Sequence, residues 1–396
     1  MKKAGRFFGW LLFFVACFAC AYYGARLVFR FEGVSKNVRI TPEPLLSGSY
    51  YYQLNDSDKE LYDALLGSVL DGGNGFDVAS VRKSEMESRF LRIINAVEYD
   101  HPELFWLKSG YKASYARSLT DEISDVIVQV PCYDFWSYSS NPQRYYDRLT
   151  AKVEEISALA NRCETDYEKA RFVYEYIINN TEYDHERLAE AQKTDHASSC
   201  DLIYTAYGCL VEGRAVCAGY AKAFKLLRGR CGISCYYVVG EAGGGKHGWN
   251  CVELDGNYYF VDATWGDGTV FDTDGNPFQN CVDFEYFCMT DEDLSVTHET
   301  DESLLDCPEC TAEYYVWFVY NGLERDSLTA EEAAEMIKKQ GGYNPALIRL
   351  TSFEAFDEIY EDEARSKLKK DIVKLLGYGC AFSFKREKRL IMVYHQ

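Results

Sequence analysis

The sequence predicts an α+β protein in which a helix that carries a cysteine packs on an antiparallel β-sheet, with smaller α+β regions before and after it. Three observations lead to this fold class. Apolar residues recur at helical spacing after Gly213. The stretch from Ser234 to Trp265 contains short apolar runs, two of which are joined by Asp255-Gly256, a strong signal for a tight hairpin. Capping boxes that begin at Thr165 and Thr329 mark further helices.

The composition is that of a folded, acidic protein. A length of 396 residues leaves room for two or three domains of roughly 100–200 residues, and a hydrophobic content of 47% excludes a disordered chain. The net charge of −20 argues against a nucleic-acid partner, because proteins that bind nucleic acids carry a basic surface. The 15 cysteines are either disulfide-bonded in an oxidising compartment, with one left over, or small buried side chains.

Residues 1–30 are a candidate membrane segment. Phe7 to Ala25 carry no charge over 19 positions, and a helix of that length rises about 28 Å, close to the thickness of the hydrocarbon core of a bilayer. Lys2, Lys3 and Arg6 precede it, which favours an N-terminus inside the cell. We therefore expect a transmembrane anchor, with the chain after residue 30 outside the cytoplasm. A cleaved signal peptide and a lipid-modified cysteine remain as alternatives, and both also export the rest of the chain.

The regions on either side of the central one have the patterns of small α+β units. Residues 31–150 contain two predicted helices and a predicted strand, at Ser57 to Leu70, Ser84 to Val97 and Asp125 to Val130. The C-terminal region, 311–396, shows no catalytic motif. Its predicted elements are strands at Tyr314 to Tyr320 and Ala346 to Leu350, a helix from Thr329 to Gly341, a long helix from Phe353 to Leu376, and a hairpin of Cys380 to Lys385 with Leu390 to Tyr394.

The central region, residues 151–300, carries the candidate chemistry. Tyr220, Ala223, Phe224 and Leu227 stand at i, i+3, i+4 and i+7, which predicts an amphipathic helix with Cys217 in its first turn. The N-terminus of a helix carries positive partial charge and free N–H groups, and both favour a thiolate. A cysteine at this position alone is more often a small buried side chain.

The hairpin that follows brings a histidine and an aspartate together. If Asp255-Gly256 forms the two-residue turn, Leu254 pairs with Asn257. His247 and Asp262 then project from the same face of the sheet, roughly 7–8 Å apart at the backbone, which is within reach of an imidazole–carboxylate hydrogen bond. Each residue alone has a commoner structural explanation.

The three residues together predict a nucleophilic triad. A cysteine that forms a thiolate, a histidine and an aspartate that orients it are the parts of this catalytic unit. Asp262 also stands in an apolar strand pattern, Tyr258 to Trp265, where an unpaired carboxylate would be costly to bury. The joint pattern is much less frequent by chance than its parts.

These residues also carry a resemblance to a known family. The stretch from Tyr207 to Asp267 resembles the transglutaminase-like superfamily, a papain-related group of Cys-His-Asp enzymes. One position departs from the pattern, because Gly248 stands where alanine is more usual. The segments Asp100 to Trp106 and Tyr286 to His298 further resemble exported bacterial proteins that carry this domain. The matching motifs are Gly213 to Ala221, Gly232-Ile233, His247 to Asn250 and Val261 to Trp265, with Tyr183-Asp184 upstream.

The resemblance implies a transglutaminase-like core and a role for each member of the triad. Cys217 is expected to be the nucleophile, His247 the general base and acid, and Asp262 the residue that orients His247. The backbone N–H of Cys217 is the expected first oxyanion donor. The candidates for the second donor and for substrate contacts are Tyr207, Trp249 and Trp265. We expect no cofactor and no metal.

Three functions remain open at this point. The family pattern favours an extracytoplasmic cysteine protease or amidase that cleaves protein or peptide amide bonds through a thioester. A transglutaminase would resolve the same thioester with an amine and cross-link proteins. A non-catalytic, membrane-tethered binding module on the same fold is the third interpretation. The expected partners are a protein or peptide substrate and, through the N-terminal helix, a membrane; no nucleic acid is expected.

Three further motifs have weaker functional interpretations. Cys307-Pro308-Glu309-Cys310 is half of a zinc knuckle, and a disulfide or a simple loop is the preferred interpretation. Asp272 to Asn276 resembles a calcium loop, but its glycine comes too early for an EF-hand, so a turn is expected. His298, in an acidic loop, is assigned a structural role.

Overall fold

The computed structural model describes residues 38–395 apart from 117–118, 134, 136–138, 140, 194–201, 272–276 and 342–344. The predicted membrane segment, Phe7 to Ala25, lies outside the described residues. Among the helices that the structure does describe, none combines the length and the apolar character needed to cross a membrane.

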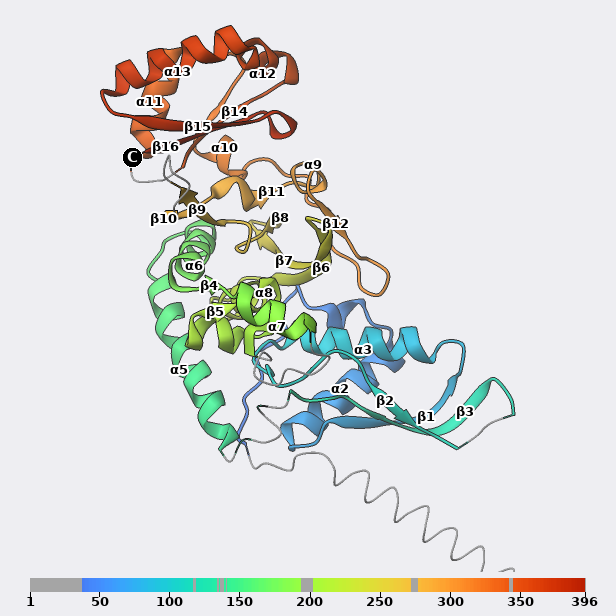
Figure 1. Cartoon of the computed structure of the whole chain (residues 1–396). Helices are drawn as coiled ribbons and strands as arrows, with labels where there is room; N and C mark the ends of the chain where they lie inside the picture. The colour runs from blue at the N-terminus through green and yellow to red at the C-terminus, as the bar shows by residue number, and fades with distance from the viewer. Residues whose placement is uncertain are drawn as a thin grey trace, which may run out of the picture.

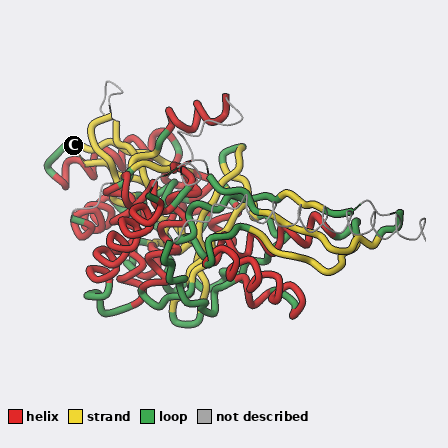
Figure 2. The backbone as a smooth tube through the Cα atoms, turned by 90° about the horizontal axis from the view of Figure 1, so that it is seen from below, coloured by secondary structure: helices red, strands yellow, loops and turns green. Residues whose placement is uncertain are grey.

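The N-terminal part is a pair of helices on a small antiparallel sheet. Its elements are η1 (Tyr50–Gln53), α2 (Asp56–Leu70), β1 (Gly75–Arg82), α3 (Met86–Asp100), β2 (Lys112–Ser114) and β3 (Glu122–Gln129). The strand order is β1-β3-β2, and Phe76 of β1 meets Phe90 of α3 edge to face, with ring centroids 6.0 Å apart. Both predicted helices and the predicted strand are confirmed. The sheet projects away from the rest of the molecule (Figures 1 and 2).

The central part packs helices against a five-stranded antiparallel sheet of order β11-β8-β7-β6-β12. Its helical elements are α5 (Pro142–Ala160), α6 (Asp166–Asn180), α7 (His185–Lys193), η3 (Gly208–Glu212), α8 (Cys217–Arg230), η4 (Phe284–Tyr286) and α9 (Asp291–Ser295). Its strands are β4 (Glu182–Tyr183), β5 (Arg214–Ala215), β6 (Cys235–Ala242), β7 (Gly245–Leu254), β8 (Asn257–Val261), β9 (Asp267–Phe271), β10 (Pro277–Val282), β11 (Phe287–Met289) and β12 (His298–Thr300). Helix α5 spans residue 150, where the sequence suggested a division between regions.

The predicted hairpin register is confirmed, but one predicted strand boundary is wrong. Leu254 pairs with Asn257, and Asp255 and Gly256 both have positive φ, at 50° and 76°, as a type I′ turn requires. The stretch from Glu241 to Lys246 forms the end of β6, a tight turn and the start of β7. The return strand does not reach Trp265. It ends at Val261, because the carboxylate of Asp262 accepts the next backbone N–H groups and turns the chain away.

The C-terminal part places helices on a four-stranded sheet of order β13-β14-β16-β15. Its elements are α10 (Trp317–Tyr320), β13 (Glu324–Arg325), α11 (Ala330–Gln340), β14 (Ala346–Leu350), α12 (Phe353–Tyr360), α13 (Asp362–Leu376), β15 (Cys380–Lys385), η5 (Arg386–Lys388) and β16 (Leu390–His395). The capping box, the strand β14 and the terminal hairpin are confirmed.

Two C-terminal predictions are wrong. The stretch Tyr314 to Tyr320 contains the short helix α10 in place of a strand, because Trp317 stacks on Phe284 of the central part with ring centroids 3.7 Å apart. The long helix from Phe353 to Leu376 is two helices, because Glu361 between them adopts an extended conformation.

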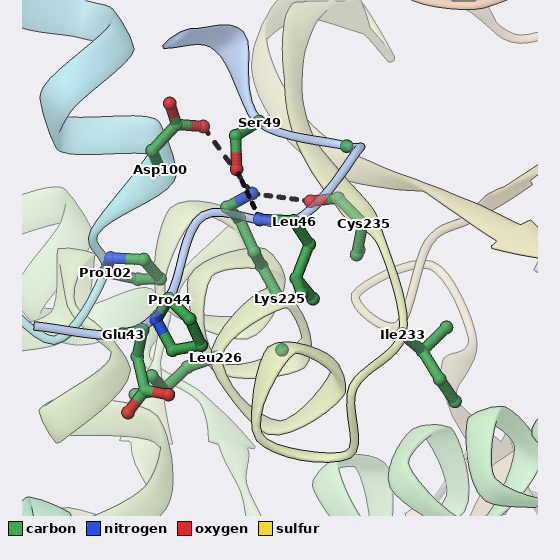
Figure 3. Close-up of a pocket in the computed structure, with 12 residues that line it drawn as sticks. Glu43, Pro44, Leu46, Ser49, Asp100, Pro102, Lys225, Leu226, Ile233 and Cys235 are labelled. Carbon is green, nitrogen blue, oxygen red and sulfur yellow. Dashed lines mark hydrogen bonds and ion pairs between the residues drawn. The ribbon is translucent and has the colours of Figure 1, made fainter. Parts of the chain in front are cut away.

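Buried charges join the N-terminal part to helix α8. Lys222 Nζ lies 2.7 Å from Glu98 Oε1 of α3, and both side chains are 9% exposed. One helical turn further on, Lys225 Nζ donates to the carbonyl of Cys235 at 2.5 Å and lies 3.9 Å from Asp100 Oδ1 (Figure 3). Isolated buried charges are unfavourable, so these pairs tie α8 to both α3 and β6.

We predict that Gly240→Ala destabilises the chain by about 1–3 kcal/mol, as overpacking does. A Cβ on Gly240 would lie 2.0 Å from the carbonyl oxygen of Glu299 on the neighbouring strand β12. Gly229→Ala in helix α8 is the matched control, because its Cβ would meet nothing within 4 Å and alanine favours the helix by roughly 0.5–1 kcal/mol. Urea denaturation of both variants measures the difference, and equal midpoints would contradict it.

Candidate active site

Cys217 is the first residue of helix α8, as the sequence predicts. The residue before it, Val216, is extended and donates its N–H to the carbonyl of Ile203 at 2.9 Å, which fixes where the helix begins. The Cys217 side chain is partly exposed and its thiol is free. A thiol at this position combines access from solvent with the positive end of the helix dipole.

His247 lies between Cys217 and Asp262. Its Nε2 atom is 2.7 Å from Asp262 Oδ2, and the two side chains are 7% and 1% exposed. The Cys217 side chain is also close enough to His247 to raise its pKa. Because Nε2 faces the carboxylate, Nδ1 is the nitrogen available to the thiol. The structure therefore brings the three predicted residues together, from the start of α8, from β7 and from the position directly after β8.

The Asp262 carboxylate accepts four hydrogen bonds. Its Oδ1 atom accepts the backbone N–H groups of Thr264 at 2.9 Å and Trp265 at 3.1 Å. Its Oδ2 atom faces Nε2 of His247 and also Nε2 of His298, the latter at 3.1 Å. His298 is the site residue that sequence reasoning missed. It lies on β12, which pairs with β6, and only this long-range pairing places it at the carboxylate.

The charges in this cluster stabilise one another. Burial lowers the pKa of His247, but the Asp262 carboxylate and the hydrogen bonds to Asp262 and Cys217 outweigh burial and raise it to about 10. Burial raises the pKa of Asp262, but His247 and His298 outweigh burial and hold it well below its usual range. Asp262 is therefore ionised and His247 protonated at neutral pH, which is the state that an ion pair with a thiolate requires.

A comparison with protein families bears on this geometry. Residues 156–263 match the model of the transglutaminase-like superfamily, and the matched segment contains Cys217, His247 and Asp262. The chain carries a transglutaminase-like domain. The fold is that of this superfamily, with helix α8 on a curled antiparallel sheet.

The transglutaminase-like domain also resembles individual proteins. Human kyphoscoliosis peptidase is 31% identical over 143 residues, which cover 32% of this chain and 20% of that protein. The mouse protein of the same name is 29% identical over 146 residues, covering 34% and 21%. The chain thus spans about a fifth of the length of the curated relatives it matches. A crystal structure of a TGase aligns with a TM-score of 0.28 and 15% identity, over 55% of this chain and 60% of that one.

Two of the three accessory candidates lie beside the triad. In the transglutaminase-like domain Trp249 stacks on His247, with ring centroids 5.9 Å apart. Trp265 lies 6.0 Å from His247 and 4.8 Å from His298, measured between ring centroids. Tyr207 is elsewhere. Its ring stacks on Phe105 at 5.2 Å, and its hydroxyl accepts a hydrogen bond from Arg148 at 2.5 Å.

Tyr183 is a second residue that the sequence did not single out as a donor. Its hydroxyl lies next to the backbone of Cys217. Burial and the neighbouring Cys217 raise the pKa of Tyr183 to about 12, so the hydroxyl keeps its proton at neutral pH and can donate it in a hydrogen bond. The structure therefore offers Tyr183, and not Tyr207, as the hydroxyl next to the nucleophile.

The departure at Gly248 has a steric cause. A Cβ at this position would lie 2.8 Å from the hydroxyl oxygen of Tyr237 on the neighbouring strand β6. The Tyr237 side chain therefore occupies the space that an alanine methyl group at position 248 would need. The glycine leaves His247, next to it in the chain, on the face that meets Asp262.

The remaining motifs do not join this site. Cys310 Sγ lies 3.6 Å from Cys251 Sγ, and all twelve cysteines in the described part of the chain are free. The candidate calcium loop, Asp272 to Asn276, lies outside the described residues. Among the described residues, ligating atoms of His247, Asp262 and His298 lie within 4.8 Å of one another and could hold a metal ion.

We predict that Asp262→Asn lowers the pKa of His247. The carboxylate is the largest of the influences that raise this pKa to about 10, so the variant loses the imidazolium proton at a lower pH than the unchanged chain does. NMR titration of the six histidines measures the shift. Asp255→Asn, in the hairpin turn at the far end of β7, is the control and leaves the titration of His247 in place. An unchanged midpoint in Asp262→Asn would contradict the geometry.

Proposed function

We propose that the transglutaminase-like domain is a cysteine-dependent acyl-transfer enzyme that acts on amide bonds of proteins or peptides. The observation that carries the proposal is the position of His247, which is hydrogen-bonded to Asp262 at 2.7 Å and also lies next to Cys217. A nucleophile, a base and a group that orients the base are the minimal unit of nucleophilic catalysis.

The reaction proceeds in two halves. The Cys217 thiolate attacks the amide carbonyl carbon, a C–S bond forms, and the carbonyl oxygen becomes an oxyanion. The His247 imidazolium gives its proton to the departing amine, the C–N bond breaks, and a thioester remains. Neutral His247 then takes a proton from the incoming water or amine, which attacks the thioester. The C–S bond breaks, and the thiolate and the imidazolium are restored.

Two donors are placed to stabilise the oxyanion. The backbone N–H of Cys217 stands at the start of α8, where helical N–H groups have no partner within the helix. The Tyr183 hydroxyl adjoins the same backbone group. We propose that Tyr183 moves from this backbone contact to the oxyanion when substrate binds, and that Trp249 and Trp265 flank the ring of His247 without donating to the substrate.

Hydrolysis is the outcome that we favour. The human and mouse relatives are both named peptidases. Amine transfer is the alternative, because the same thioester can be resolved by a lysine side chain. The net charge of −20 favours the approach of basic, amine-bearing partners, whether the thioester is resolved by water or by an amine.

We also propose an extracytoplasmic location in a bacterium, with the N-terminal segment as a membrane anchor. The support is the uncharged stretch from Phe7 to Ala25 and the cationic residues before it. Labelling of intact cells with a thiol reagent that does not cross membranes tests this location, and the absence of labelling under conditions that label lysed cells would contradict it.

We predict that Cys217→Ala abolishes turnover, with a loss of at least about 1000-fold in kcat, because the nucleophile is removed. The assay incubates the chain with a glutamine-containing protein and a labelled primary amine, and follows new N-termini, released ammonia and bound label. Cys163→Ala, another free and partly exposed cysteine, is the control and retains activity.

The products separate the three functions. New N-termini or ammonia without label identify a protease or amidase, and bound label that depends on Cys217 identifies a transglutaminase. If no product forms, and iodoacetamide reacts with Cys217 no faster than with Cys163, the domain is a non-catalytic module and the proposal fails.

We predict that Tyr183→Phe lowers kcat by about 100-fold, the effect of removing one oxyanion donor, and leaves the KM for substrate nearly unchanged. Tyr207→Phe is the matched control, because its hydroxyl contacts Arg148. Steady-state kinetics of both variants measure the effect. A loss of kcat in Tyr207→Phe and none in Tyr183→Phe would reverse the assignment.

A further inference from the structure

His298 and His247 share a single carboxylate oxygen. Their Nε2 atoms lie 3.1 Å and 2.7 Å from Asp262 Oδ2. The His298 side chain is fully buried, and its ring lies against the rings of Trp249 and Trp265, at 5.0 Å and 4.8 Å between centroids. Strand β12 holds it there through pairing with β6, in which His298 stands opposite Ala242.

The hydrogen bonds fix the tautomer of His298. A carboxylate oxygen only accepts, so His298 Nε2 must carry the proton that it shares with Asp262. The other ring nitrogen, Nδ1, lies 2.8 Å from Thr297 Oγ1 and accepts from this hydroxyl when His298 is neutral. Asp262 thus receives four donors, two from the backbone and two from imidazoles, and the cluster is satisfied without an ion.

We propose that His298 is a positioning residue for the triad, which acts by holding the Asp262 carboxylate ionised and in the orientation that His247 requires. This inference rests on the proposed acyl-transfer function. The two backbone donors hold Oδ1 only, whereas His298 holds the same oxygen that His247 uses. Without His298, that oxygen has one donor, His247 itself, so fewer contacts fix the position of Oδ2.

The other titratable groups around Asp262 do not replace His298. Tyr174, Tyr183 and Tyr286 lie close enough to interact with the carboxylate, and burial raises the pKa of each hydroxyl, so all three stay neutral. Cys217 reaches the cluster through His247. Among the described residues, the side chains that hold the Asp262 carboxylate through hydrogen bonds are therefore those of His247 and His298.

The test compares His298→Phe, which keeps a ring and removes the donor, with His298→Gln, which keeps an N–H donor. Two quantities are measured against pH, namely kcat on a peptide or protein amide and the rate at which iodoacetamide alkylates Cys217. We expect His298→Phe to lower kcat about tenfold with little change in KM. A loss of this size is typical when a residue that orients a functional group through a hydrogen bond is removed. The acid limb of both profiles moves to higher pH, because the carboxylate loses a donor that favours its ionised form.

Rescue separates positioning from packing. We expect His298→Gln to recover most of kcat and to restore the acid limb. His101→Phe is the matched control, because His101 is also buried and paired with a carboxylate, Glu103, at 2.8 Å. It lowers the stability of the chain and leaves both pH profiles in place.

Three results would overturn the proposal. The first is an acid limb in His298→Phe that matches the unchanged chain. The second is a loss in His298→Gln equal to that in His298→Phe, which would assign the residue to packing. The third is an alkylation rate that EDTA changes in the unchanged chain but not in His298→Phe, which would make His298 a metal ligand. The alkylation profile needs no substrate, so it tests His298 even if the chain turns over no amide.

Discussion

The buried charge of Asp262 is the constraint on which the site depends. A carboxylate that is 1% exposed is tolerated only when hydrogen bonds and opposite charges replace the water that it has lost. Those partners come from β7, from β12 and from the turn that follows β8. The arrangement of the sheet edges, the end of β8 and the direction of the His247 ring therefore all follow from one requirement.

Helix α8 also contains buried charges whose burial is offset by oppositely charged or hydrogen-bonding partners. Lys222 and Lys225 face inward on this helix and meet Glu98 and Asp100 of α3 or a backbone carbonyl of β6. An apolar helix face can pack against many different surfaces. A buried lysine instead requires a partner that places a carboxylate or another acceptor next to its ammonium group. The N-terminal part is for this reason a specific partner of the helix that carries Cys217, and not a separate appendage.

Local signals in the sequence were sufficient for the triad. The position of Cys217 follows from apolar spacing, and the approach of His247 to Asp262 follows from a two-residue turn whose register is fixed by geometry. Contacts between distant segments were not accessible in this way. His298 reaches the site only because β12 pairs with β6. The sequence also could not show which tyrosine lies next to Cys217, because Tyr183 and Tyr207 are the same residue type and only the folded chain separates their positions. The stretch Tyr314 to Tyr320 is a continuous apolar run like that of a buried strand, yet part of it is helical, and Trp317 in this part stacks on Phe284.

The contact between Gly248 and Tyr237 links two positions on neighbouring strands. An alanine at 248 and a tyrosine at 237 cannot both keep the present positions, because the added Cβ would lie 2.8 Å from the hydroxyl oxygen. Alanine at 248 is tolerated only where Tyr237 has been replaced by a smaller residue, so the effect of one substitution depends on the presence of the other. A lineage that exchanges this glycine for alanine must first shorten the tyrosine, so the order of mutations next to the catalytic histidine is itself constrained.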